Sequence, residues 1–252
     1  MHLHVSGVPR DSSGAYLTGF KIGPFLSSIA STAWSWRGDT KLNIEELLRA
    51  CPVIPVVTLE SAEVAADVAR ALVRGGIRSL EVTLRTPSAL RAIEAIARNV
   101  PEIHVGAGTV RTLADLRSAA CAGAAFAVSP GATAALLDAA HTGGIAYLPA
   151  VATASELMLA MDAGYRYVKV FPAAQAGGPR LLQGLGAPFP EARFCPTGGI
   201  TPRTLRSYLE LWNVLSVGGS WLTPPSAVAQ RDWKRIEKLA RAARAAARKC
   251  RK

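Results

Sequence analysis

Eight short hydrophobic segments follow one another at fairly even spacing between residues 53 and 221. They are VIPVVTL (53–59), SLEVTL (79–84), IHVGAGTV (103–110), AAFAVSP (124–130), IAYLPAVA (145–152), YVKVFPA (167–173), ARFCPTGGI (192–200) and VLSVGGSW (214–221). Runs of this length and composition are typical of buried strands. Segments with helical periodicity, such as 61–76, 87–101 and 153–164, separate them, and several end in glycine, as helices often do.

This alternation predicts the fold class. Strands that alternate with helices form right-handed βαβ units around a parallel sheet. Eight such units favour an α/β protein with a single (β/α)8 TIM barrel. A doubly wound open sheet is the alternative, but it usually has fewer strands, and no GxGxxG motif opens the first βα turn. In a barrel, the catalytic groups are expected at the carboxyl ends of the strands.

The first 40 residues do not follow this pattern. They show no clear period and many small polar residues, which predicts a poorly ordered extension. They also lack the Arg-rich pattern of a transit peptide and the apolar core of a secretory signal. Order is expected to begin near Asn43, which has the spacing of a capping box with Glu46. Residues 41–252 are therefore expected to form the barrel domain.

The net charge of +11 is concentrated near the carboxyl terminus. Residues 231–252 hold ten Lys/Arg and two Asp/Glu, which leaves 19 Lys/Arg and 16 Asp/Glu, about +3, for the other 230 residues. Apolar Ile236, Leu239, Ala240 and Ala243 predict a closing helix with a basic outer face. A solvated helix end is the simpler interpretation. Binding to nucleic acid is the alternative, and the uneven placement of the charge and the lack of an aromatic stacking surface beside the basic run argue against it.

Composition adds two further expectations. No apolar run reaches the roughly 18 residues that a membrane span needs, so no membrane association is expected. The four cysteines have neither metal-ligand spacing nor a CxxC motif, and the histidines after residue 40 stand apart from other ligand types. This usage favours reduced thiols in a cytoplasmic protein and predicts no metal site.

One lysine stands out from the other basic residues. Lys169 is the only lysine between Lys41 and Lys234, and it lies within the hydrophobic segment YVKVFPA. Alternate residues of a strand share a face, so Lys169 is expected to point into the barrel with Tyr167 and Phe171. It can serve as a structural ion-pair partner, a phosphate ligand or a covalent amine. The covalent role needs a neutral amine, which apolar burial favours and a nearby carboxylate opposes.

A second polar face occurs in LEVTLRT. Glu81, Thr83 and Arg85 alternate with apolar residues, so this face is also expected to point into the barrel. A buried ion pair that holds the barrel together is one interpretation. The functional one assigns Glu81 as a general acid/base and Arg85 as an anion clamp.

Glycine pairs mark the ends of the last two predicted strands, in PTGGI and GGSWLTP. The loops after strands seven and eight of TIM barrels often bind phosphate through backbone N–H groups. Glycine there lets an anion approach the backbone closely. The predicted phosphate site consists of Gly198, Gly199, Gly218 and Gly219, with hydroxyl groups from Thr197 and Ser220.

Taken in order along the chain, these motifs resemble the 2-keto-3-deoxy-6-phosphogluconate (KDPG) aldolase and 4-hydroxy-2-oxoglutarate aldolase family, the class I aldolases of the Entner–Doudoroff pathway. The resemblance spans about residues 43 to 245. The matching stretches are LEVTLRT, VGAGTV, VSPG, ASELMLAMDAGY, VKVFPA, RFCPTGGI and VGGSWL.

The resemblance implies a (β/α)8 fold, usually a homotrimer, and a cytoplasmic lyase that cleaves KDPG, a phosphorylated 2-keto acid, to pyruvate and glyceraldehyde 3-phosphate without a cofactor. Side activity on 4-hydroxy-2-oxoglutarate is left open. The residues implied are Lys169 as Schiff-base lysine, Glu81 as acid/base, Arg85 and Thr109 at the pyruvate carboxylate, Pro130 and Phe171 in the pocket wall, and Thr197, Gly198, Gly199 and Ser220 at the phosphate and hydroxyl end. An isomerase or epimerase of the same fold, with Lys169 as an acid or a charge ligand, is the rival.

Overall fold

The computed structural model describes residues 42–250, in which parallel strands alternate with helices. The strands are β1 (Val53–Val57), β2 (Ser79–Thr83), β3 (His104–Gly108), β4 (Phe126–Val128), β5 (Ala146–Leu148), β6 (Ala150–Val151), β7 (Tyr167–Val170), β8 (Arg193–Pro196) and β9 (Val217–Gly219). The helices are α1 (Ile44–Ala50), α2 (Ala65–Arg74), α3 (Ala89–Asn99), α4 (Leu113–Cys121), α5 (Ala134–Gly143), α6 (Ala154–Asp162), α7 (Gly178–Gly186), α8 (Leu205–Leu209), α9 (Pro225–Ala229) and α10 (Trp233–Cys250). The extension predicted over residues 1–40 lies outside the described range.

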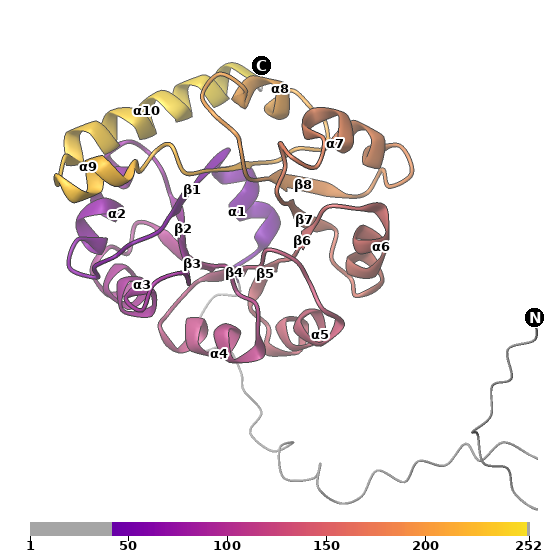
Figure 1. The fold of residues 1–252 in the computed structure, drawn as a ribbon, viewed down its shortest axis with the longest axis horizontal. Helices are drawn as coiled ribbons and strands as arrows, with labels where there is room; N and C mark the ends of the chain where they lie inside the picture. The colour runs from indigo at the N-terminus through magenta and orange to yellow at the C-terminus, as the bar shows by residue number, and fades with distance from the viewer. Residues whose placement is uncertain (1–41, 251–252) are drawn as a thin grey trace, which may run out of the picture. The chain divides into compact units, whose positions relative to one another are not determined.

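The strands form a curled parallel sheet with helices on its outside (Figure 1). One part has the strand order β5-β4-β3-β2-β1-β9, and a second part has the order β6-β7-β8. β5 and β6 come from the single predicted segment 145–152 and are separated only by Pro149. A parallel bridge between Thr197 and Gly218 joins the end of β8 to β9. The predicted α/β class with a parallel sheet is thus confirmed.

Each predicted segment contains a strand, but the strands end earlier than the hydrophobic runs. β2 ends at Thr83, and the Leu84 N–H then donates to the Gly108 carbonyl at 2.8 Å before the chain turns toward α3. Arg85 lies in this turn with an exposed side chain. Arg85 therefore lies two residues beyond the end of β2, in the turn that follows the strand and not in the strand itself.

α1 covers the amino-terminal side of the strands. It begins after Asn43, as predicted, but the Asn43 side chain accepts from the Glu45 N–H at 2.8 Å, and no reciprocal bond from Glu46 completes a capping box. The Tyr167 hydroxyl, at the start of β7, donates to the Glu45 carboxylate. Figure 1 draws α1 within the ring of strands. α1 thus lies at the amino ends of the strands, on the side away from the expected site.

α10 packs along α2. Its buried face consists of Ile236, Ala240, Ala243 and Ala247. A Cβ atom on Gly75, at the end of α2, would overlap the Ala240 side chain and lie 2.9 Å from the Glu237 carbonyl oxygen. Small residues on both helices therefore allow a close approach. Of the helices in the described range, none is long and apolar enough to span a membrane.

This contact leads to a stability prediction. Gly75→Ala is expected to lower the free energy of unfolding by about 1–3 kcal/mol, because the added methyl group meets α10 backbone that cannot give way cheaply. Gly184→Ala is the matched control: Gly184 is exposed within α7 with open space at its Cβ position. Alanine there should raise the free energy of unfolding by up to about 1 kcal/mol. Urea titration of both variants gives the comparison, and equal stabilisation of both would contradict close α2–α10 packing.

Candidate active site

The inside of the curled sheet holds one buried ion pair. Lys169 of β7 and Glu81 of β2 have side chains that are only 6% and 5% exposed, and Nζ lies 3.2 Å from Oε1 and 3.5 Å from Oε2. β2 pairs with β1 and β3, whereas β7 pairs with β6 and β8. The contact therefore crosses the interior between strands that are not neighbours. It places a buried amine within reach of a buried proton acceptor.

Gly108 creates the space for the Glu81 carboxylate. It lies on β3, opposite Thr83 of β2. A Cβ atom on Gly108 would overlap the carboxyl group of Glu81. Sequence reasoning did not single out Gly108, although a glycine inside a strand often marks a close approach of another group. The position of the Glu81 carboxylate thus depends on glycine, which has no side chain, at position 108 of the neighbouring strand.

Two further side chains surround the Lys169 amine. The Phe171 ring centroid lies 5.3 Å from Nζ. Cys195, which is opposite Lys169 in the register of β7 and β8, is buried. Burial raises the pKa of the Cys195 thiol to about 12, although the Lys169 ammonium acts in the opposite direction. Because the thiol stays protonated near neutral pH, Cys195 does not compete with Lys169 as a nucleophile.

Arg85 and Thr109 come together just beyond the carboxyl ends of β2 and β3. The Arg85 Nε donates to the Thr109 hydroxyl at 3.2 Å. Thr109 has a φ of 60°, in the left-handed region that a β-branched residue rarely adopts. Such backbone conformations concentrate at ligand sites, where the surrounding structure holds them. No described acidic residue forms an ion pair with Arg85, so its guanidinium can receive an anion.

The loop after β8 carries the first predicted glycine pair. Gly198 and Gly199 have φ values of 101° and 73°, which side-chain-bearing residues rarely adopt. Gly199 is exposed, and so is Ser220 after β9. These residues lie at the carboxyl ends of their strands, where the sequence predicts a phosphate site.

Gly218 and Gly219, the second predicted glycine pair, pack against neighbouring side chains. Both are buried. A Cβ atom on Gly218 would overlap the Thr197 side chain, and one on Gly219 would overlap the Trp221 ring. These glycines therefore make room for Thr197 and Trp221, and the predicted contact of their backbone N–H groups with phosphate stays a prediction. Thr197 is itself buried, with only a long contact of 3.5 Å from its hydroxyl to the Cys195 carbonyl.

Pro130 lies at the carboxyl end of β4 and is partly exposed. It follows the buried Ser129, whose hydroxyl accepts a hydrogen bond from the Tyr147 hydroxyl at 2.6 Å. This buried bond anchors the loop that begins with Pro130, and sequence reasoning had not found it.

Within residues 42–250, no three His, Cys, Asp or Glu side chains gather in a way that could hold a metal ion.

Comparisons with known proteins agree with these observations. The family model for KDPG and KHG aldolase matches residues 44–239. A 2-dehydro-3-deoxy-phosphogluconate aldolase of Pseudoalteromonas atlantica is 48% identical over 207 residues, which cover 82% of this chain and 96% of the relative. A KHG/KDPG aldolase of Escherichia coli strain K12 is 51% identical over 203 residues, 81% of this chain and 95% of the relative.

Among solved structures, the KDPG aldolase of Legionella pneumophila, with pyruvate captured at low pH as a covalent carbinolamine intermediate, aligns with a TM-score of 0.79. It is 44% identical, and the alignment covers 81% of this chain and 99% of that one. The KDPG aldolase of Zymomonas mobilis aligns with a TM-score of 0.76 at 45% identity, over 80% and 96% of the two chains. The chain therefore belongs to the KDPG and KHG aldolase family.

Proposed function

We propose that this protein is a class I aldolase that cleaves KDPG to pyruvate and glyceraldehyde 3-phosphate, with 4-hydroxy-2-oxoglutarate as a second candidate substrate. The observation that carries the proposal is the buried pair in which the Lys169 amine lies 3.2 Å from the Glu81 carboxylate. The Legionella pneumophila relative, whose structure contains a covalent carbinolamine of pyruvate, supports covalent amine chemistry in this family.

The first half of the reaction forms the covalent intermediate. The neutral Lys169 amine adds to the C2 ketone of KDPG and yields a carbinolamine. Loss of water then produces an iminium ion, and Glu81 carries the protons that these two steps transfer. Glu81 lies within hydrogen-bonding distance of the amine, so the same carboxylate can take and return a proton there.

The second half breaks the carbon–carbon bond. Glu81 takes the proton of the C4 hydroxyl, the C3–C4 bond breaks, and its electron pair moves into the iminium, which becomes an enamine. Glyceraldehyde 3-phosphate leaves as the aldehyde. Protonation of the enamine at C3 and hydrolysis of the resulting iminium release pyruvate and restore the amine. The lysine serves as the electron sink throughout.

Borohydride reduction in the presence of pyruvate tests this proposal. The reduced adduct is expected on the peptide that contains Lys169, because borohydride converts an imine into a stable amine. Lys238 provides a matched control, since it is exposed on α10, and its peptide should remain unmodified. Mass spectrometry of the digested protein measures both. An unmodified Lys169 peptide would favour the rival, an isomerase or epimerase in which this lysine only binds charge or transfers a proton.

The two ends of the substrate are expected to respond to different substitutions. Arg85→Lys should weaken both the exchange of pyruvate methyl protons and the cleavage of KDPG, because lysine cannot copy the two parallel hydrogen bonds from a guanidinium to a carboxylate. Ser220→Ala should impair cleavage of phosphorylated substrate and leave pyruvate exchange nearly unchanged. Proton NMR of pyruvate and a coupled cleavage assay measure the two rates. If Arg85→Lys spares pyruvate exchange, the carboxylate and phosphate ends are reversed.

We infer further that the strands close into a (β/α)8 barrel in which β5 and β6 count as one strand. The Thr197–Gly218 bridge between β8 and β9 supports closure on one side, and the single residue between β5 and β6 supports it on the other. Residues 41–252 are proposed as the aldolase domain, in agreement with the family match over 44–239.

A homotrimer is the proposed assembly. The exposed apolar side chains of Met158 and Leu159 on α6 and of Trp212, 54%, 44% and 60% exposed, offer surface that another copy can cover. A cytoplasmic location is proposed as well. It fits the four cysteines of the described residues, which are all free thiols.

A further inference from the structure

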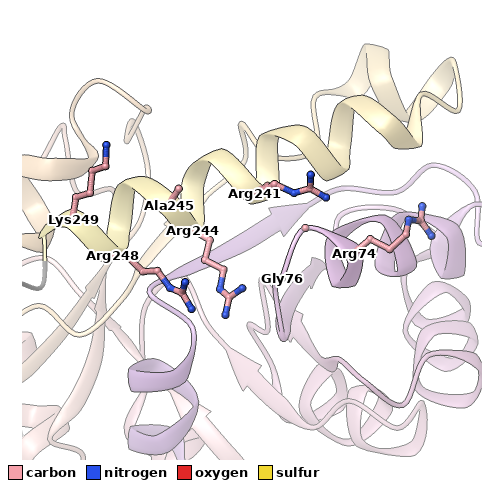
Figure 2. Close-up of a pocket in the computed structure, with 8 residues that line it drawn as sticks. Arg74, Gly76, Arg241, Arg244, Ala245, Arg248 and Lys249 are labelled. Carbon is pink, nitrogen blue, oxygen red and sulfur yellow. The ribbon is translucent and has the colours of Figure 1, made fainter.

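A group of arginines lines two adjoining hollows beside α10. The larger hollow has a volume of about 590 Å³ and is lined by residues that include Arg74, Gly76, Arg241, Arg244 and Arg248. The smaller one, of about 250 Å³, is lined by Arg49 and Pro52 and again by Arg244 and Arg248. Figure 2 shows the Arg244 and Arg248 side chains extending from the same side of α10, whereas Lys249 points the other way.

The hollows lie at the opposite end of the strands from the aldolase site. Gly76 precedes β2, and Pro52 immediately precedes β1, so both belong to the amino-terminal side of the sheet. Arg85, Gly199 and Ser220 follow the carboxyl ends of their strands. The arginine cluster is therefore separate from the substrate site described above, and what it binds does not depend on the aldolase assignment.

Three of the six described cations that line the hollows have acidic partners, whereas Arg244, Arg248 and Lys249 form no ion pair within residues 42–250. Glu237 pairs with Arg74 at 3.2 Å and with Arg241 at 2.5 Å. Within residues 42–250, no ion pair or hydrogen bond is formed by the guanidinium groups of Arg244 and Arg248. The two are four residues apart on one helix face, where like charges destabilise a helix.

Gly76 holds one of these guanidinium groups close to the backbone. Gly76 has a φ of 88°, and a Cβ atom there would lie 2.6 Å from the Arg244 Nη1. The Arg244 side chain thus lies against the turn that follows α2, at the wall of the larger hollow. Arg74 in the last turn of α2 also lies near the negative end of the α2 dipole. Arg244 and Arg248 have no acidic partner among residues 42–250.

We propose that these hollows form a binding site for a small anion with two or more phosphate groups, held by Arg244 and Arg248. Guanidinium groups bind phosphate oxygens through two parallel hydrogen bonds. The larger volume falls within the roughly 300–1,000 Å³ typical of small-molecule sites. Arg241 to Arg248 spans about 10 Å along the helix at 1.5 Å per residue, which suits an oligophosphate. A nucleic acid would need a longer basic track with aromatic residues for stacking, and none of the described residues that line the two hollows is aromatic.

Titration calorimetry of the full chain with inorganic tripolyphosphate at about 0.15 M salt tests the site. Arg244→Gln/Arg248→Gln is expected to bind about tenfold more weakly or worse, since two charge-assisted contacts are lost. Arg235→Gln/Lys238→Gln removes the same charge from exposed positions of α10 outside the hollows and should bind within about twofold of the unmodified protein. Tripolyphosphate should also raise the melting temperature of the unmodified protein, and the Arg244/Arg248 variant should lose this rise.

Four results would overturn the proposal. The first is no binding by the unmodified protein at about 1 mM tripolyphosphate. The second is equal weakening in both double variants, which would indicate general charge attraction, and the third is full binding by the Arg244/Arg248 variant, which would place the anion elsewhere. The fourth is tighter binding of a single-stranded RNA of about 20 nucleotides than of tripolyphosphate, which would indicate a polynucleotide surface. Circular dichroism of each variant verifies that α10 remains helical.

Discussion

Replacing Lys169 with arginine is expected to abolish KDPG cleavage and pyruvate trapping while the protein stays folded. Arginine keeps a positive charge opposite Glu81, so it avoids the penalty of about 3–5 kcal/mol that follows when one partner of a buried ion pair is removed. Its larger head group should lower the free energy of unfolding by about 1–3 kcal/mol through crowding. A guanidinium stays protonated at any working pH and therefore cannot add to the C2 ketone.

The measurement combines a cleavage assay with borohydride trapping and a urea unfolding curve. Lys238→Arg is the control, because it makes the same substitution at an exposed lysine of α10 and should change neither activity nor trapping. Substantial cleavage by a folded Lys169→Arg variant would contradict the covalent mechanism. An unfolded variant would show itself in the urea curve, and trapping on the Lys169 peptide of the unmodified protein remains as an independent test.

Glu81→Gln is expected to lower the rate of cleavage by about 100- to 10,000-fold, which corresponds to about 3–5 kcal/mol in the activation barrier. Glutamine has nearly the same shape as glutamate and can occupy the space beside Gly108, but it cannot take the proton of the C4 hydroxyl. Because Lys169 is retained, borohydride should still trap pyruvate on long incubation. The two variants are thus distinguished. Lys169→Arg should lose both cleavage and trapping of pyruvate, whereas Glu81→Gln should lose mainly cleavage.

Thr83→Val is the matched control for Glu81. Thr83 shares the inward face of β2, is buried, and its hydroxyl lies 2.8 Å from the Thr58 hydroxyl. Loss of that hydrogen bond should reduce stability by about 1 kcal/mol and change the cleavage rate far less than Glu81→Gln does. If Glu81→Gln loses less than about threefold in both cleavage and pyruvate exchange, well below the usual contribution of an acid/base group, Glu81 is a structural partner of Lys169.

The two central residues of the candidate site were accessible from sequence because their signals are local. A strand places alternate side chains on opposite faces, so a lysine and a glutamate within hydrophobic segments must face either the helices or the interior. The helix side was already occupied by apolar residues such as Leu80 and Val82, which are fully buried. This reasoning required only the identity of neighbouring residues and the period of a strand.

The distance between Lys169 and Glu81 was beyond such reasoning. The two residues are 88 positions apart, in strands that share no hydrogen bonds. Their contact depends on the curvature of the sheet and on the space left by Gly108, which are properties of long-range packing. The same holds for Arg85, which lies in an exposed turn beyond the end of β2 and meets Thr109, 24 residues away, after β3.

The sequence by itself thus determined the order of strands and helices, the inward faces, the glycine-rich ends and the basic character of residues 231–252, because each follows from a short period or from composition. Only the tertiary structure decided which of these groups meet. In the folded protein the Thr197 side chain packs against Gly218, and the Glu237 carboxylate forms ion pairs with Arg74 and Arg241. Within residues 42–250, Arg244 and Arg248 form no ion pair. Ion pairs depend on distances of a few ångströms between segments that are remote in the chain, and no local pattern encodes those distances.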